Sequence, residues 1–319
     1  MPTYNKANLA MAASQYGFQR DTFEKVLRLK KVLEYCQEKK LLKEHLVLKG
    51  GTAINLTVFD LPRLSVDIDM DYIPNDSRDE MLAVREEISK TIKDYMESEG
   101  YLLTDRSRFS HSLDSFIFRY QNAGGNRDVL KIELNYSLRA HVLDPVYREI
   151  ITDMFGGQPL LYMVDPIEIF AAKANALISR AAARDLYDFN NLILNGKFEE
   201  KSERDLLRKT IIFYATISSK TLNRFFETDA IDNLTITKIR RDLFPVLRNQ
   251  EIRAHFDLDL YKNRAKEYLK ELMTVSQGES DYLECFMRGE YRPDLLFDDR
   301  TIVERIAKHP MAIWKCNNM

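Results

Sequence analysis

Three aspartates alternate with apolar residues in the stretch VDIDMDY, where Asp67, Asp69 and Asp71 stand two positions apart. Side chains two positions apart on a strand point to the same side, so a strand would place all three carboxylates on one face. Neighbouring carboxylates repel one another and are costly to bury without a cation. Magnesium prefers a few carboxylate oxygens together with substrate phosphates. The pattern therefore predicts a site for Mg²⁺, with Mn²⁺ as the alternative, and for a nucleotide.

A Gly-Gly-Thr sequence, residues 50–52, follows the short apolar run HLVLK and precedes a helical pattern. Glycines at such a turn let a phosphate approach the N–H groups at the start of the helix, and Thr52 would add a hydroxyl donor. The pattern of a Walker A loop is absent. Asp67 comes fifteen residues after Thr52 and directly after RLSV, and this combination indicates a nucleoside triphosphate site. The alternative interpretation is an edge strand with exposed aspartates beside an ordinary turn.

A third carboxylate is expected from a neighbouring strand, and KIELN supplies Glu133. Its strand pattern places Lys131, Glu133 and Asn135 on one face and apolar residues on the other. We predict Glu133 as a metal ligand beside the aspartates; the alternative is a solvated strand glutamate. With two metal ions, such a site can activate an attacking oxygen and stabilise a leaving pyrophosphate.

The composition is that of an ordinary globular protein, with 319 residues, 45% hydrophobic, 30% charged and a net charge of −2. This balance argues against a surface covered in positive charge, although a local basic groove remains compatible with it. The three cysteines form no CxxC pair, which fits a reducing compartment without a structural zinc site. No apolar run approaches the roughly 18 to 20 residues of a membrane span. We expect a cytoplasmic protein.

The elements that must position these residues follow from periodicity. The expected strands are HLVLK, LSVDIDMDY, DSFIFRYQ and DVLKIELNYS, with the last two joined by the turn NAGGNR. The expected helices cover 21–43, TAINLTVFDL, 79–98, 202–218, 219–227, 260–275, 279–288 and 300–308.

The sequence pattern changes near residue 165 to one that predicts mostly helices. Asp165 is a predicted helix N-cap, and Pro166 is the predicted first helical residue. The segment 165–194 is helical by composition. We therefore predict an α+β fold, with a mixed sheet in residues 1–160 and a mostly α-helical lobe in residues 161–319 that completes the nucleotide site.

Three stretches resemble one family. KGGTAINL…RLSVDIDMDY is similar to the first motif of the AbiEii-type nucleotidyltransferase toxins, of the DNA polymerase β-like superfamily. DPIEIFAAKANALISRAAARDLYDF is similar to their KxxAL…RDLYD segment, and YRPDLLFDDRTIVERIAKHPMAIWK resembles their C-terminal ending. The resemblance implies a bilobed nucleotidyltransferase of a type IV toxin–antitoxin or abortive phage-defence system. Its partner would be a DNA-binding antitoxin that acts without a stable complex.

The resemblance also assigns residues by position. Asp67 and Asp69 match the metal-binding aspartates, and Asp71 is left as a supporting residue. Ser65 matches a serine implicated in nucleotide handling and in phosphorylation that silences some relatives. Lys173 and Asp185 match a lysine and an aspartate treated as essential. Relatives of the MenT kind transfer nucleotides from an NTP to the 3′ end of tRNA.

The residues of the second motif are compatible with those roles. Lys173 could direct its ammonium at the triphosphate, and its alternative is a lysine that snorkels from an amphipathic helix. Arg180 and Arg184 follow near two and three helical turns later and could extend one positive stripe, so Arg184 is a candidate nucleotide ligand. Two roles are open for Asp185. It either holds Lys173 or a ribose hydroxyl, or forms a structural ion pair with Arg180 or Arg184.

In the predicted reaction, an acceptor hydroxyl attacks the α-phosphate of an NTP in line, and pyrophosphate leaves toward Gly50, Gly51, Thr52 and Lys173. A tRNA acceptor would require basic residues. The candidates are Arg204, Arg208, Lys209, Lys238, Arg240, Arg241 and Arg248. The alternatives are transfer to a small molecule or a protein, or a non-catalytic nucleotide-binding partner protein. The five histidines show no metal-ligand spacing, and His309 is interpreted as structural.

Overall fold

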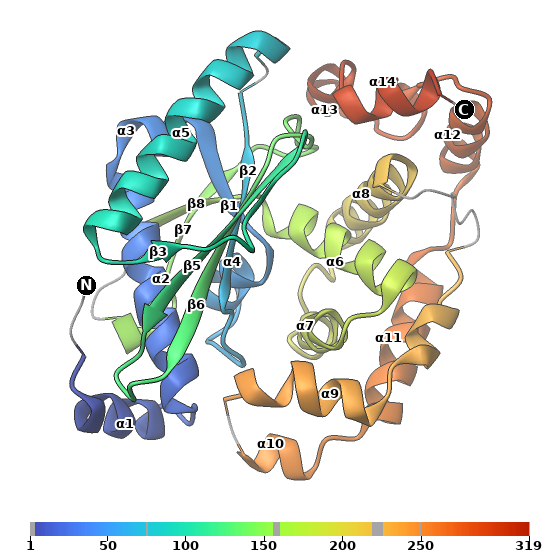
Figure 1. The fold of residues 1–319 in the computed structure, drawn as a ribbon. Coiled ribbons are helices and arrows are strands. Elements are labelled where there is room, and N and C mark those ends of the chain that lie inside the picture. Colours follow the sequence, from blue (N-terminus) through green and yellow to red (C-terminus); the bar gives the residue numbers. More distant parts are fainter. Residues whose placement is uncertain (1–3, 75, 156–159, 219–225, 249, 319) are drawn as a thin grey trace. The chain divides into compact units, whose positions relative to one another are not determined.

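The computed structural model describes residues 4–74, 76–155, 160–218, 226–248 and 250–318. The chain forms two compact units (Figure 1), which we call the sheet unit and the helical unit. The sheet unit comprises Met1–Arg139, Pro145–Val164 and Pro245–Ala254, and the helical unit comprises Ala140–Asp144, Asp165–Phe244 and His255–Met319.

The sheet unit contains one eight-stranded sheet with helices around it. Its strands are β1 (Leu46–Lys49), β2 (Asp67–Tyr72), β3 (Leu102–Leu103), β4 (Arg108–Phe109), β5 (Leu113–Gln121), β6 (Arg127–Asn135), β7 (Val146–Glu149) and β8 (Leu160–Met163). Its helices are α1 (Lys6–Gln15), α2 (Arg20–Glu38), α3 (Lys40–His45), α4 (Gly50–Thr57), α5 (Arg78–Ser98), the short 3₁₀ turn Asp153–Phe155, and α10 (Gln250–Ala254).

The strand order is β3-β5-β6-β2-β1-β8-β7, and β4 pairs with β5. β2 runs parallel to β6 and antiparallel to β1, while β5 and β6 form an antiparallel hairpin. The sheet is therefore mixed, which confirms the predicted fold class. The predicted NAGGNR turn joins Gln121 to Arg127, the last paired residues of that hairpin.

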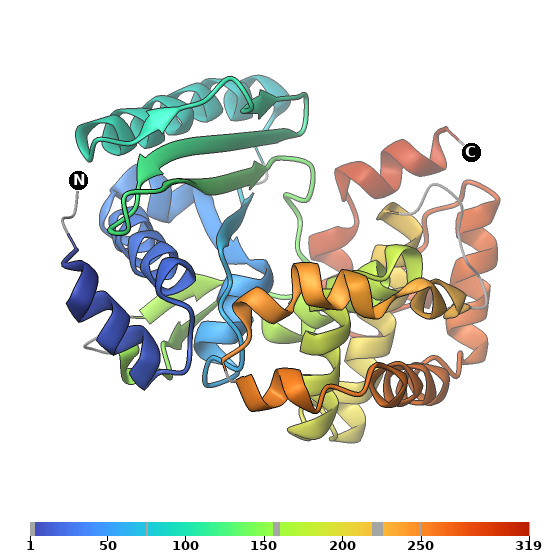
Figure 2. The ribbon, with the colours of Figure 1, turned by 60° about the horizontal axis from the view of Figure 1, so that its bottom comes forward.

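One face of this sheet is the core of the unit, and α5 covers part of it. In Figure 2, α5 lies along the β5–β6 hairpin. Arg85 of α5 forms an ion pair with Asp114 of β5 at 2.5 Å, and Lys93 lies 6.0 Å from the Phe116 ring centroid. The fully buried side chains of this face include Phe116, Phe118, Leu130, Ile132, Leu134, Ile68 and Met70. Because side chains alternate, the residues between these point to the opposite face.

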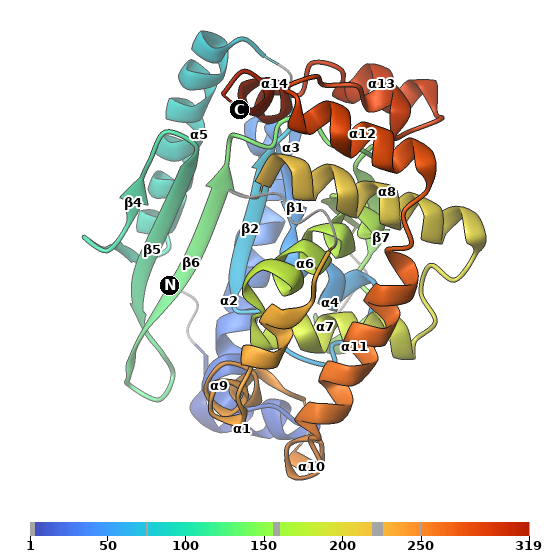
Figure 3. The ribbon, with the colours of Figure 1, turned by 90° about the vertical axis from the view of Figure 1, so that its right-hand side faces the viewer.

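The first long helix of the helical unit, α6, begins at the predicted residue. Asp165 caps α6 by accepting from the Ile167 N–H, and Pro166 is the first helical residue. Its helices are α6 (Pro166–Arg180), α7 (Ala183–Leu194), α8 (Lys201–Ser218), α9 (Ile236–Asp242), α11 (Leu258–Leu272), α12 (Gln277–Met287), α13 (Arg300–Ile306) and α14 (Pro310–Cys316). α6 packs on α8 and α7, and α7 packs on α11, as the view in Figure 3 shows from the side.

Most predicted elements are present within a few residues of their expected bounds, and several short ones were not predicted. The unpredicted helices and strands are α1, α9, α10, α14, β3, β4, β7 and β8. The helix expected over 219–227 falls outside the described residues except for 226 and 227, which are not helical. No helix in the described part of the chain combines the length and apolarity that a membrane crossing needs.

Candidate active site

The turn between β1 and α4 brings two glycines against the predicted site. Gly50 has a φ of +73°, and a Cβ placed on it would lie 2.9 Å from Oδ2 of Asp69. A Cβ on Gly51 would lie 2.7 Å from Nη2 of Arg63 and 3.1 Å from Oγ of Ser65. A side chain at Gly50 would strain the backbone and displace the Asp69 carboxylate, and one at Gly51 would displace the Arg63 guanidinium.

The carboxylates stand on adjacent strands. Asp69 of β2 pairs with Glu133 of the parallel strand β6 and with Lys49 of the antiparallel strand β1. Asp67 pairs with Lys131 of β6 in the same register. Glu133, predicted as the third carboxylate from a neighbouring strand, thus lies directly beside Asp69.

Two lysines lie among these carboxylates. Lys49 forms an ion pair with Asp71 at 2.5 Å, and Asp71 is only 2% exposed. Lys131 forms an ion pair with Glu133 at 2.6 Å. Neither lysine was predicted as part of the site, although both lie on strands that carry or adjoin the acids.

Asp69 has the clearest electrostatic perturbation in the site. Burial of its carboxylate raises its pKa to about 6. Lys49 opposes this rise in the pKa, whereas Asp67 and Glu133 add to it. A carboxylate held among other carboxylates in a desolvated position is a position where a bound cation would be stabilising.

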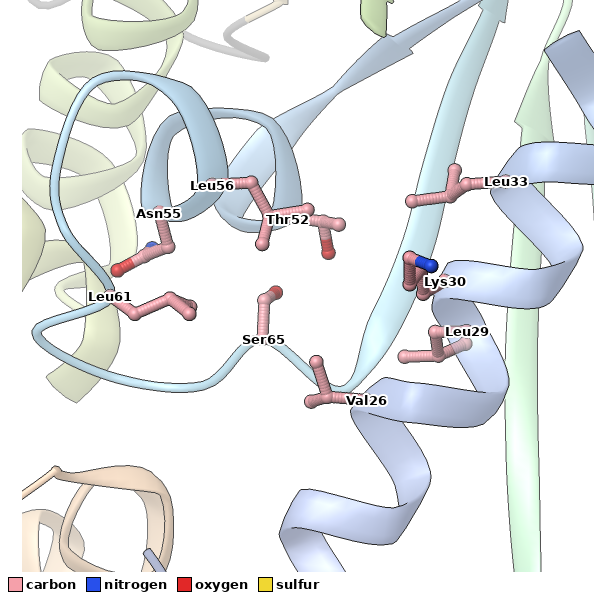
Figure 4. Close-up of a pocket in the computed structure, with 9 residues that line it drawn as sticks. All are labelled: Val26, Leu29, Lys30, Leu33, Thr52, Asn55, Leu56, Leu61 and Ser65. Carbon is pink, nitrogen blue, oxygen red and sulfur yellow. The ribbon is translucent and has the colours of Figure 1, made fainter. Parts of the chain in front are cut away.

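The side chains of Thr52 and Ser65 line the same small cavity. Thr52 donates its hydroxyl to the Asp67 carbonyl at 2.5 Å, which ties α4 to β2. Figure 4 shows both side chains on the wall of a small cavity. Its volume of about 10 Å³ matches a single water molecule. A hollow of about 270 Å³ lies beside α2 and β8, and neither cavity is lined by Asp67, Asp69 or Glu133.

The predicted residues of the second motif form a separate cluster in the helical unit. Lys173 is 8% exposed, and its ammonium lies 3.2 Å from Oδ1 of Asp185 and 2.7 Å from Oδ2 of Asp188. Asp188 is completely buried. Lys173 is therefore a buried ion-paired lysine, and the snorkelling alternative is wrong. Arg180 reaches Asp185 at 4.0 Å, so Asp185 makes both kinds of ion pair considered for it.

The positive stripe from Lys173 through Arg180 to Arg184 is not formed. α6 ends at Arg180, because Ala181 adopts a left-handed conformation with a φ of +45°. Arg184 belongs to α7 and donates its Nε–H to the Asp242 carbonyl at 3.0 Å. The three side chains therefore do not follow one helical face.

Most basic residues predicted for RNA contact have acidic partners. Arg204 pairs with Glu199 and Glu271, and Arg208 pairs with Asp205 and Glu279. The other ion pairs are Lys209–Asp298, Arg241–Asp242 and Arg248–Asp60. These clusters are largely neutralised locally, as expected for solvated helix faces.

His309 has the structural role predicted for it. It is completely buried and caps α14 by accepting from the Ala312 N–H at 3.4 Å. Burial, followed by the nearby His141, lowers its pKa to about 4. The histidine is therefore neutral near neutral pH.

A Gly-Gly turn, a row of aspartates on one strand and a glutamate on the next define the class of protein: such an arrangement is that of a nucleotidyltransferase core. The profile of the family described as nucleotidyl transferase AbiEii toxin, type IV toxin–antitoxin system, matches residues 33–290. The chain belongs to this family and is a nucleotidyltransferase toxin of a toxin–antitoxin system.

Several solved structures match the chain, and one of them illustrates the shared fold. The chain is similar to MenT4, a nucleotidyltransferase toxin from Mycobacterium tuberculosis H37Rv, with a TM-score of 0.64 and 16% sequence identity. The match covers 96% of this chain and 99% of the MenT4 chain. No protein of curated function matches the sequence significantly.

Proposed function

We propose that this toxin transfers a nucleoside monophosphate from an NTP to a hydroxyl of an RNA acceptor, the 3′ end of a tRNA. Asp67, Asp69 and Glu133 are the proposed ligands of Mg²⁺ or Mn²⁺. The observation that carries this proposal is the desolvated Asp69 carboxylate, which lies between Glu133 and Lys49 on adjacent strands and against Gly50.

The chemistry of the donor set fits a divalent cation, because it consists of carboxylates on neighbouring strands with a raised pKa at its centre. Among the described residues, no three His, Cys, Asp or Glu side chains converge closely enough to form a ready metal site. Glu133 is held by Lys131 instead, so loading the site requires these side chains to rearrange. A bound cation would neutralise the carboxylates and polarise the reacting phosphate.

The roles of the remaining residues are proposed in the same way. Gly50, Gly51, Thr52 and Ser65 are assigned to the nucleotide phosphates, since the turn exposes the backbone at the start of α4. Lys173 is assigned to offset negative charge on the triphosphate, Asp185 to hold Lys173, and Arg184 to the nucleotide. The antitoxin is proposed to act without forming a stable complex.

The test is incubation of the purified protein with Mg²⁺, each α-³²P-labelled NTP in turn, and total tRNA. We expect label on tRNA, and we expect Asp67→Asn/Asp69→Asn to lower the rate at least about a hundredfold, since metal stabilisation is worth several kcal/mol. Mn²⁺ should raise the thermal midpoint of the wild type but not of this variant. Label on the protein itself would indicate self-modification. No label, and no Mn²⁺ effect, would reject the metal-dependent reaction.

A further inference from the structure

The face of the sheet that carries the acids continues across β6 and β5 with basic side chains. Asp67 pairs with Lys131 on β6, and Lys131 pairs with Ile117 on β5. Two positions further along the two strands, Val129 pairs with Arg119. Paired residues, and residues two positions apart, share a face. Lys131, Val129 and Arg119 therefore lie on the same face as Asp67.

Two more arginines belong to this face by the same rule. Arg127 stands two positions before Val129 on β6 and pairs with Gln121. Arg108 of β4 pairs with Ser115, which itself pairs with Glu133. We call Arg108, Arg119, Arg127 and Lys131 the basic face. At the ordinary rise of a strand, Lys131 and Arg127 are about 13 Å apart along β6.

The arginines of the basic face are exposed and have no acidic partner. Arg108, Arg119 and Arg127 form no ion pair with any residue that the structure describes, and Asp105, in the β3–β4 connection, is the exposed acid nearest in sequence to Arg108. On the opposite face, by contrast, Arg85 is paired with Asp114. Positive charge without an acidic partner is thus present on the face that carries the proposed metal ligands.

Apolar side chains lie beside Arg119 on this face. Leu102 of β3, which pairs with Arg119, is 55% exposed, and Val129 is half-buried. Exposed arginines separated by apolar groups on an open strand surface suit a flexible polyanion, because guanidinium groups bind phosphates through paired hydrogen bonds. A small-molecule acceptor at Asp67 and Asp69 would not reach Arg127.

We propose that the basic face binds the sugar–phosphate backbone of the RNA acceptor and directs its 3′ end toward Asp67 and Asp69. Lys131 is the link between the two, because it stands opposite Asp67 and contacts Glu133. The proposal rests on the proposed function, since it specifies where the acceptor of that reaction lies.

The experiment measures binding of a short single-stranded RNA, labelled at its 5′ end, to the full chain by fluorescence anisotropy in EDTA. The test variant is Arg108→Gln/Arg119→Gln/Arg127→Gln. The matched control is Arg148→Gln, an exposed strand arginine on β7 at the far edge of the same sheet. Because the three arginines are exposed and unpaired, the thermal midpoint should not change.

We expect the triple variant to bind the RNA at least about tenfold more weakly in 50 mM salt, and the slope of log Kd against log salt to fall by about 2, because each phosphate contact on a single strand contributes about 0.7. The corresponding Arg→Lys variant should keep most of the slope. In the transfer reaction, KM for RNA should rise and KM for the NTP should stay unchanged.

Two outcomes separate the proposals. If wild-type protein labels RNA while the triple variant binds and reacts like Arg148→Gln, the basic face is rejected and the proposed function stands. If wild-type protein neither binds nor labels RNA under any condition, the RNA acceptor is rejected and the basic face with it.

Discussion

Asp69 and Asp71 share one face of β2 but differ in their surroundings. Asp71 is buried against the Lys49 ammonium, whereas the pKa of Asp69 is raised to about 6 by burial and by two neighbouring carboxylates. Lys49 also acts to lower the pKa of Asp69. Asp71 therefore holds the Lys49 ammonium beside Asp69, the proposed metal ligand. This gives a physical reason for a third aspartate on β2.

Gly50 is the residue on which the geometry around Asp69 depends most. At its φ of +73° an L side chain strains the backbone, and a Cβ would lie 2.9 Å from Asp69 Oδ2, so the carboxylate would have to move. We expect Gly50→Ala to lower the free energy of unfolding by about 2–3 kcal/mol, of which about 1–2 kcal/mol is backbone strain. The transfer rate should fall by more than tenfold, because Asp69 must move. Urea unfolding and the labelled-NTP assay measure the two effects.

Gly125 is a matched control for the backbone part of this effect. It has a φ of +87°, and nothing lies within 4 Å of a Cβ placed on it. Gly125→Ala should therefore show only the strain of about 1–2 kcal/mol and keep full activity. Equal losses of stability and activity in the two variants would contradict the claim that close approach to Asp69 is what requires Gly50.

At the scale of elements, Lys173 joins α6 to α7. Its ammonium lies between Asp185 and Asp188 of α7, just beyond the break at Ala181. Removing one partner from a buried ion cluster leaves uncompensated charge. A loss of activity in a Lys173 variant is therefore evidence for a catalytic role only when the stability of that variant has been restored.

We expect Lys173→Met to lower the free energy of unfolding by about 3–5 kcal/mol and Lys173→Met/Asp188→Leu to recover a large part of it, since apolar replacement of a buried pair is often neutral. If Lys173 acts on the triphosphate, the recovered double variant stays inactive. Chemical denaturation and the transfer assay are read together. A double variant that regains transfer would show that Lys173 is needed only to hold α6 and α7.

Periodicity predicted the main helices and strands but not which of them lie next to one another. Strict alternation located β2, and strand-like runs joined by a glycine-containing turn located β5 and β6, whose apolar positions are buried on one side. The pairing of Asp69 with Glu133 depends on tertiary register between distant segments, which no local pattern encodes. The helix break at Ala181 contains neither glycine nor proline, so no ordinary helix-stop signal marks it. Short strands such as β7 and β8 contain too few residues for a period to be visible.

Across the whole molecule, charge pairing decides which basic residues are available to a polyanion. The predicted arginines and lysines of the helical unit lie close together in sequence, but most are balanced by acids from other helices. The arginines of the basic face lie on three strands and are brought together only by the register of the sheet. Clusters in sequence were therefore a poor guide to net surface charge, and the proposed acceptor surface could not be predicted from them.

The helical unit contains a buried titratable group that should make the stability of the molecule sensitive to acid. His309 has a pKa of about 4 in the folded protein, whereas an unfolded histidine has a pKa of about 6.5. Between these values the unfolded chain binds a proton that the folded chain excludes, so stability falls as the pH falls. The carboxylate of Glu168, held by His141 and by backbone N–H groups, has a lowered pKa and stays charged in this window.

We therefore expect the protein to lose about 2 kcal/mol of unfolding free energy between pH 7 and pH 5 through His309, at about 1.4 kcal/mol per pH unit below the unfolded pKa. Asparagine is a good N-cap, so His309→Asn should keep the cap of α14 and remove this loss. Urea unfolding at both pH values, followed by far-UV circular dichroism and by the fluorescence of Trp314 on α14, measures the difference. His141 and Glu168 are common to both proteins, so an equal pH dependence in the variant would assign the acid sensitivity to groups other than His309.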